Sequence, residues 1–72
     1  SRYLPSGVIM EQIRLKEDKL ALFSGKYSSA VEVMDCLQHS PYLTDLSFIG
    51  SIMTEQDGER FKIVGMLRDE IK

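Results

Sequence analysis

The segment that most constrains the fold of this chain is one helix-like stretch between two pairs of strand-like stretches. Ser29 and Glu32 have the spacing of a capping box, in which a hydroxyl and a carboxylate satisfy backbone N–H groups at a helix start. From Ala30 onward, apolar residues recur at i, i+3, i+4 and i+7, which gives a helix one apolar face. Pro41 cannot continue such a helix. The sequence therefore predicts a helix over Ala30–Gln38.

Two strand-like segments precede the predicted helix. Residues 8–16 and 19–27 alternate apolar and polar side chains on either side of a short polar break, which is typical of a β-hairpin. In the first segment, one face is expected to carry Ile9, Glu11, Ile13 and Leu15.

Two more segments follow the helix, residues 42–53 and 59–67, separated by the turn dipeptide Asp57-Gly58. The element order is therefore β-β-α-β-β. A right-handed crossover through the helix makes the second and third strands parallel and leaves room between them for the fourth. We expect an α+β, ferredoxin-like fold in circularly permuted order. Its antiparallel sheet should have the strand order 3-4-2-1, with the helix on one face.

The chain starts abruptly for such a fold. Tyr3 and Leu4 are apolar residues with nothing before them to pack against, and Pro5 disfavours a helix that runs up to it. The further helix of a ferredoxin-like domain would naturally precede the first strand. We therefore expect residues 1–72 to form a single small domain that is a fragment of a larger protein, with the upstream helix missing.

The composition argues against several classes of function. Nine Lys and Arg residues against eleven Asp and Glu give a net charge of −2. The basic residues are scattered, whereas nucleic-acid-binding proteins show a basic stripe. No apolar run approaches the roughly 20 residues that a membrane-spanning helix needs. The single cysteine, Cys36, excludes an internal disulfide and a cysteine-based zinc cluster.

Few residues suggest catalysis or metal binding. Asp35, Cys36 and His39 share the predicted helix, and a nucleophile could face a base at this spacing. A packed cysteine and a histidine near the negative end of the helix explain the same residues without chemistry. The acidic residues around Gly58 lack the spacing of a calcium-binding loop. We therefore expect no enzymatic activity, no catalytic, cofactor-binding or metal site, and no cofactor.

Two other functions of ferredoxin-like domains stay open as alternatives. RNA binding needs exposed aromatic side chains that stack on bases. The nearest match to such a motif contains a lone aromatic residue and is Gly58-Glu59-Arg60-Phe61-Lys62-Ile63. The second alternative is sensing of a small ligand, as in ACT-like domains, for which no residue pattern stands out.

Four segments of the chain form a pattern beyond their strand and helix periodicity. They are Leu4-Pro5-Ser6-Gly7-Val8, Ala21-Leu22-Phe23-Ser24-Gly25-Lys26-Tyr27-Ser28, Ser40-Pro41-Tyr42-Leu43-Thr44-Asp45-Leu46 and Gly58-Glu59-Arg60-Phe61-Lys62-Ile63. Together, and in this order, they resemble a family of bacterial inner-membrane assembly-platform proteins. This family comprises the pilus assembly N protein of type IV pili and the related L protein of type II secretion. The chain departs from the pattern at Tyr27 and Leu43, which leaves the pilus and secretion branches open.

This resemblance implies a non-enzymatic scaffold that links a cytoplasmic motor to the pilus or pseudopilus. It implies a homodimer that also pairs with a sister platform protein of like fold, of the type II secretion M or pilus O type, and no nucleic-acid partner. The implied location is the bacterial inner membrane, with this domain in the periplasm. A membrane anchor is expected upstream of Ser1.

The sheet face away from the helix is predicted to carry an interaction surface. Alternation assigns to the helix side Phe23, Tyr27, Phe61, Ile63 and Leu67. The large apolar residues left for the opposite face are Leu20, Leu22, Val64 and Met66. Such a patch suggests an interface, although a tolerated, partly exposed face is the alternative. This assignment assumes that no β-bulge occurs at Ser24-Gly25 or Gly65.

Overall fold

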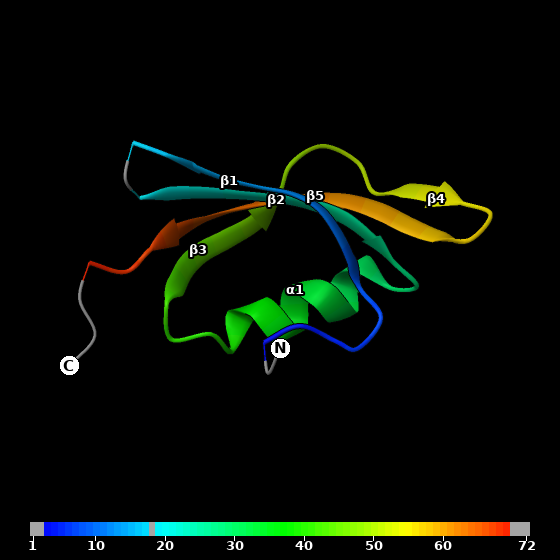
Figure 1. Cartoon of the computed structure of the whole chain (residues 1–72), viewed down its shortest axis with the longest axis horizontal. Helices are drawn as coiled ribbons and strands as arrows, with labels where there is room; N and C mark the ends of the chain where they lie inside the picture. The colour runs from blue at the N-terminus through cyan, green and yellow to red at the C-terminus, as the bar shows by residue number, and fades with distance from the viewer. Residues whose placement is uncertain (1–2, 18, 70–72) are drawn as a thin grey trace.

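The computed structural model of the protein describes residues 3–17 and 19–69. Within these residues, an α-helix lies against one face of an antiparallel β-sheet (Figure 1). In chain order the elements are β1 (Ile9–Lys16), β2 (Leu20–Tyr27), α1 (Ala30–Gln38), β3 (Leu43–Phe48), β4 (Met53–Glu55) and β5 (Gly58–Leu67). The α+β class and the predicted bounds of the helix are confirmed.

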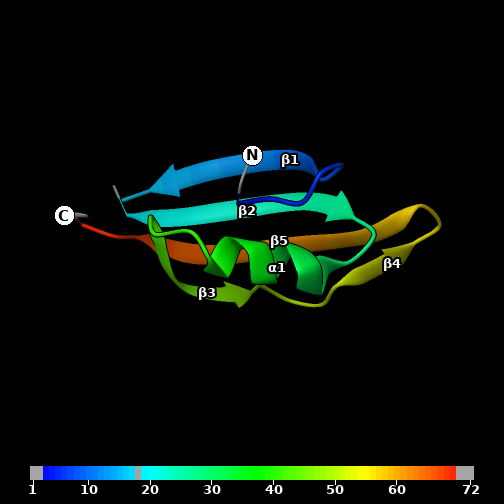
Figure 2. The ribbon, with the colours of Figure 1, turned by 90° about the horizontal axis from the view of Figure 1, so that it is seen from below.

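The described sheet has five strands, not the four that were expected. Residues 42–53, predicted as one strand, form both β3 and β4. Between these two strands the chain arcs away from the sheet and turns at Gly50, whose φ is 68° (Figure 1). The strand order is β1-β2-β5-β3, and β4 pairs with β5 beyond the end of β3 (Figure 2). β5 therefore lies between β2 and β3, and β1 lies at one edge of the sheet.

The helix begins at the predicted N-cap. The Ser29 hydroxyl accepts a hydrogen bond from the N–H of Glu32 at 3.2 Å. The carboxylate that reaches the helix start comes from β5, because Glu59 accepts from the N–H of Ala30 at 2.8 Å. A carboxylate at this end also faces the positive end of the helix dipole. A tertiary contact thus adds to the local cap.

The core lies between α1 and the three strands that α1 contacts. Phe61 and Ile63 of β5 are 1% and 0% exposed. They pack in one cluster with the buried apolar residues Ala21, Ala30, Val33, Met34, Leu37 and Leu43. The odd-numbered residues of β2 and β5 therefore face the helix, and their even-numbered residues face the other way.

A β-bulge changes the face assignment at the start of β1. The pairing of β1 with β2 shifts by one residue between Met10 and Gln12, so that Glu11 is extra. The expectation that Ile9 and Ile13 share a face is therefore wrong. Ile13 lies opposite Phe23, on the helix side of the sheet. Ile9 lies opposite Lys26, whose side chain is on the face away from the helix.

A second bulge occurs in β3, between Thr44 and Ser47, where Asp45 has a φ of 55°. The extra residue keeps the apolar side chains of β3 packed against the core on the helix side, namely Leu43, Leu46 and Phe48. The pairing of β2 with β5 contains no such shift. Both bulges thus lie in outer strands, and alternation along the two central strands is preserved.

Residues 3–8 cross the helix side of the sheet next to α1 (Figure 2). Leu4 and Val8 pack against the core. The ring of Tyr3 meets that of Tyr42 edge-on, with ring centroids 6.4 Å apart and ring planes at 78°. The apolar start of the chain therefore has packing partners within the domain.

Candidate interaction surface

The face of the sheet opposite α1, here called the open face, carries the four apolar residues singled out in the sequence. Leu20 lies directly opposite Met66, and Leu22 lies directly opposite Val64. All four are partly exposed and lie outside the core. Cross-strand neighbours on one face have Cβ atoms roughly 5 Å apart, so these side chains form one continuous apolar patch.

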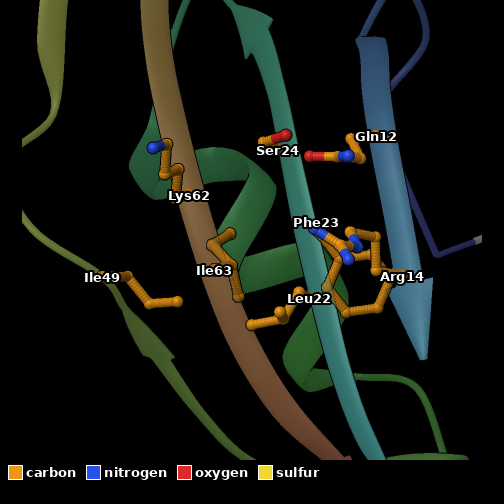
Figure 3. A pocket seen from close by; sticks show the side chains of 8 residues that line it. All are labelled: Gln12, Arg14, Leu22, Phe23, Ser24, Ile49, Lys62 and Ile63. Atoms are coloured by element: carbon orange, nitrogen blue, oxygen red, sulfur yellow. The ribbon is translucent and has the colours of Figure 1, made fainter. Parts of the chain in front are cut away.

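A shallow depression of about 180 Å³ adjoins this patch (Figure 3). It is lined by Gln12, Arg14, Leu22, Phe23, Ser24, Ile49, Lys62 and Ile63. In Figure 3 the Gln12 amide points from β1 toward Ser24 of β2. Ile49, just after β3, forms the far side and is 42% exposed. The depression thus joins an apolar floor to polar groups that extend from three strands.

Two cationic side chains stand on opposite sides of the depression. Arg14 extends from β1 across β2, and Lys62 extends from β5 on the side of β3 and β4 (Figure 3). Both residues are exposed. Neither forms an ion pair with another residue of the described ranges.

A network of paired charges occupies the far end of the open face. Lys26 and Arg60 lie directly opposite each other across β2 and β5. Two cations in such positions repel each other. Three carboxylates compensate them: Lys26 donates to Asp57 at 2.9 and 3.0 Å, Arg60 donates to Glu55 at 3.0 Å, and Arg60 also contacts Glu11. The network ties the β4–β5 turn to β1 and β2.

These contacts shift the pKa values of the groups involved. The hydrogen bond from Lys26 lowers the pKa of Asp57 below its ordinary value of 3.8. The hydrogen bond from Arg60 lowers the pKa of Glu55 below 4.5. The hydrogen bond to Asp57 raises the pKa of Lys26 above 10.5. The hydrogen bond to Glu55 likewise raises the pKa of Arg60. These two carboxylates and two cations are therefore all charged at neutral pH.

The helix does not assemble a nucleophile with a base. The Nδ1 atom of His39 lies 2.7 Å from the carbonyl oxygen of Asp35, so the ring contacts the last turn of its own helix. Cys36 is half-buried. Within the described ranges, its thiol forms no hydrogen bond with the ring of His39. Within the described ranges, no three His, Cys, Asp or Glu residues gather as a metal site.

Most residues of the motif considered for RNA binding have structural roles in the fold. Phe61 is in the core, where it cannot stack on a base, and Glu59 caps the helix. Arg60 belongs to the charge network. Of this motif, Lys62 alone is exposed on the open face.

Sequence reasoning missed the charge network, the Glu59 cap and the position of Ile49. The first two depend on the register between β2 and β5. Once Lys26 is known to lie opposite Arg60, two adjacent cations signal that nearby acids must compensate them. The position of Ile49 depends on the departure of the chain from the sheet after β3.

The fold and its open face define a small α+β domain with a partly exposed apolar sheet face. Comparison with protein families then identifies the group to which it belongs. Residues 1–66 match the family model described as fimbrial assembly protein (PilN), and the chain belongs to this family. The resemblance stated from the sequence is thereby confirmed. Searches of curated proteins and of solved structures give no match. In the described ranges, no helix has the length and apolar character that crossing a membrane requires.

Proposed function

We propose that this domain is a non-enzymatic part of the assembly platform of a type IV pilus or a type II secretion system. In this role it stands in the periplasm, on a protein anchored in the inner membrane, and helps to link the cytoplasmic motor to the pilus or pseudopilus. Membership of the fimbrial assembly family supports the assembly role. The observation that carries the proposal is the apolar patch of the open face, because a domain with such a patch is suited to bind protein.

The open face is proposed to contact a second copy or a sister platform protein of like fold. Leu22→Glu places a charge in the centre of the patch, and Met66→Lys does so at its end. Each should weaken association, measured by sedimentation of the domain alone and with the periplasmic domain of the sister protein. Circular dichroism should stay unchanged because these residues lie outside the core. The matched control is Val31→Glu, which changes an exposed apolar residue of the helix that is 66% exposed. Normal binding by both open-face variants would exclude the patch as the interface.

We also propose that the fold is ferredoxin-like in permuted order, with a further helix upstream of β1 in the complete protein. Ile13 and Leu15 support this proposal. They lie opposite Phe23 and Ala21, on the helix side of β1, yet they are 60% and 63% exposed. α1 has no contact with β1 that would cover them.

Cysteine labelling tests this second proposal. Ile13→Cys, in a background with Cys36→Ala, should react rapidly with a thiol reagent in residues 1–72. It should react more slowly in the complete protein, where the added helix covers it. Glu17→Cys, at an exposed turn position, is the control and should react equally in both. Equal labelling of Ile13→Cys in both proteins would rule out a covering helix.

A further inference from the structure

We infer that the open face takes a segment of a different protein, one that presents carboxylates beside a large apolar side chain, and not a second copy of this chain. The inference rests on the proposed function and specifies the partner of that surface. It is argued from the charges that surround the apolar patch.

The apolar part of the surface is built to hold a side chain. Leu22 lines the depression, and Ile49 lines its far side after β3 (Figure 3). Val64, which lies directly opposite Leu22, extends the apolar surface into the adjoining patch. The depression of about 180 Å³ is several times the roughly 30 Å³ that one water occupies in the liquid. An apolar side chain seated there would contact surface that is now wet.

The cations at the sides of the depression determine what else the occupant must carry. Arg14 and Lys62 have no ion-pair partner within the described ranges. A partner that covered these two cations without a counter-charge would remove their hydration, and no new interaction would offset that free-energy cost. A carboxylate resolves this cost, and the fork of the Arg14 guanidinium can bind one through two parallel hydrogen bonds. Gln12 and Ser24 add polar groups between the two cations.

A second copy does not supply those carboxylates from the same face. The acids of the charge network on the open face, Glu11, Glu55 and Asp57, each already pair with Arg60 or Lys26. In a two-fold symmetric contact the same patch meets itself, so the surplus charges on both sides are positive. Like charges brought together across an interface disfavour association. A partner with surplus negative charge is therefore favoured over self-pairing.

The test measures binding of the domain to the periplasmic domain of the sister platform protein. Arg14→Glu and Lys62→Glu should each raise the Kd about tenfold or more, because attraction becomes repulsion. Raising NaCl from about 0.1 M to about 1 M shortens the Debye length from about 10 Å to about 3 Å and should weaken binding by the native domain. The double variant Arg14→Glu/Lys62→Glu should no longer bind more weakly at high salt, because salt then screens a repulsion instead of an attraction. Arg68→Glu, an equal change of charge at an exposed position outside the depression, is the matched control.

The outcomes separate this inference from the proposed function. If Leu22→Glu weakens binding while both charge reversals leave it unchanged, the open face is the interface but the acidic partner is wrong. If none of the three variants weakens binding, the open face as interface fails, and this inference fails with it. A dimer of the domain alone that Leu22→Glu dissociates and Arg14→Glu leaves intact would identify a second copy as the occupant and overturn the inference.

Discussion

Leu46 fills the space in front of Gly65: a Cβ atom added to Gly65 would lie 2.7 Å from Cδ2 of Leu46. Leu46 lies within the β3 bulge, between Thr44, which pairs with Met66, and Ser47, which pairs with Val64. At Gly25 the nearest atom is part of the backbone: a Cβ there would overlap the carbonyl oxygen of Ile9 in β1. The two central strands therefore each contain a glycine against which an outer strand packs.

A Cβ at Gly65 would meet the end of a side chain, whereas a Cβ at Gly25 would meet backbone. Replacing each glycine by alanine should therefore lower the free energy of unfolding by different amounts. Gly65→Ala should lower the free energy of unfolding by about 1 kcal/mol, because the flexible end of Leu46 can move. Gly25→Ala should cost about 3 kcal/mol or more, because it displaces the backbone of β1. Urea denaturation measures both values.

A second substitution checks the cause. In a Leu46→Ala background, Gly65→Ala should become nearly neutral, since the atom it meets is gone. Gly25→Ala should keep its full cost in that background. Additive effects of Gly65→Ala and Leu46→Ala would show that the two residues do not interact as described.

The helix start predicts a graded response at Glu59. Glu59→Ala removes the acceptor for the N–H of Ala30 and should lower the free energy of unfolding by about 1–2 kcal/mol. Glu59→Gln keeps an acceptor and loses the charge that faces the helix dipole, so its cost should be smaller. Ser29→Ala should cost about 1 kcal/mol by removing the local cap. Thermal denaturation ranks these variants, and an equal loss for Glu59→Gln and Glu59→Ala would argue against the hydrogen bond.

The charge network predicts a loss of stability in acid. The pKa values of Glu55 and Asp57 are lowered in the folded protein from 4.5 and 3.8. The unfolded chain therefore binds more protons than the folded protein as the pH falls through this range. The stability that the network contributes is fully present above the ordinary pKa values, and it is lost as the pH falls through the lowered pKa values of the folded protein. Because both groups are exposed to solvent, the effect should be small.

Urea midpoints between about pH 6 and about pH 3 measure this loss. The double variant Glu55→Gln/Asp57→Asn should show a flatter pH profile than the native protein. Glu17→Gln is the control, because Glu17 is exposed and has no ion pair with a described residue. Identical profiles for the native protein and the double variant would mean that the network adds no stability.

The helix residues Cys36 and His39 are predicted to be dispensable for function. His39 contacts the carbonyl of Asp35, and Cys36 is half-buried. Cys36→Ala with His39→Ala should therefore cost about 1 kcal/mol of stability. Pilus assembly or secretion by the complete protein should persist. A specific loss of that activity, with the thermal unfolding midpoint retained, would give these residues a functional role.

Local signals in the sequence determined the helix and the four segments that pair around it. Ser29 and the spacing of apolar residues after it specify α1 without help from the rest of the chain. Alternation correctly separated Leu22 and Val64 from the core because no bulge interrupts the pairing of the two central strands. The family resemblance came from the same short segments.

Tertiary structure decided the bulges, the split of the third segment into β3 and β4, and the carboxylate at the helix start. The bulge in β1 lies beside Gly25, which the β1 backbone approaches closely. Alternation within β1 does not reveal that neighbour. Arg14 and Lys62 are ordinary charged residues in the sequence. They become a surplus charge because pairing of the strands gives the acids of the charge network, Glu11, Glu55 and Asp57, to Lys26 or Arg60. Local sequence sets periodicity, whereas charge balance on a face depends on contacts between residues far apart in the chain.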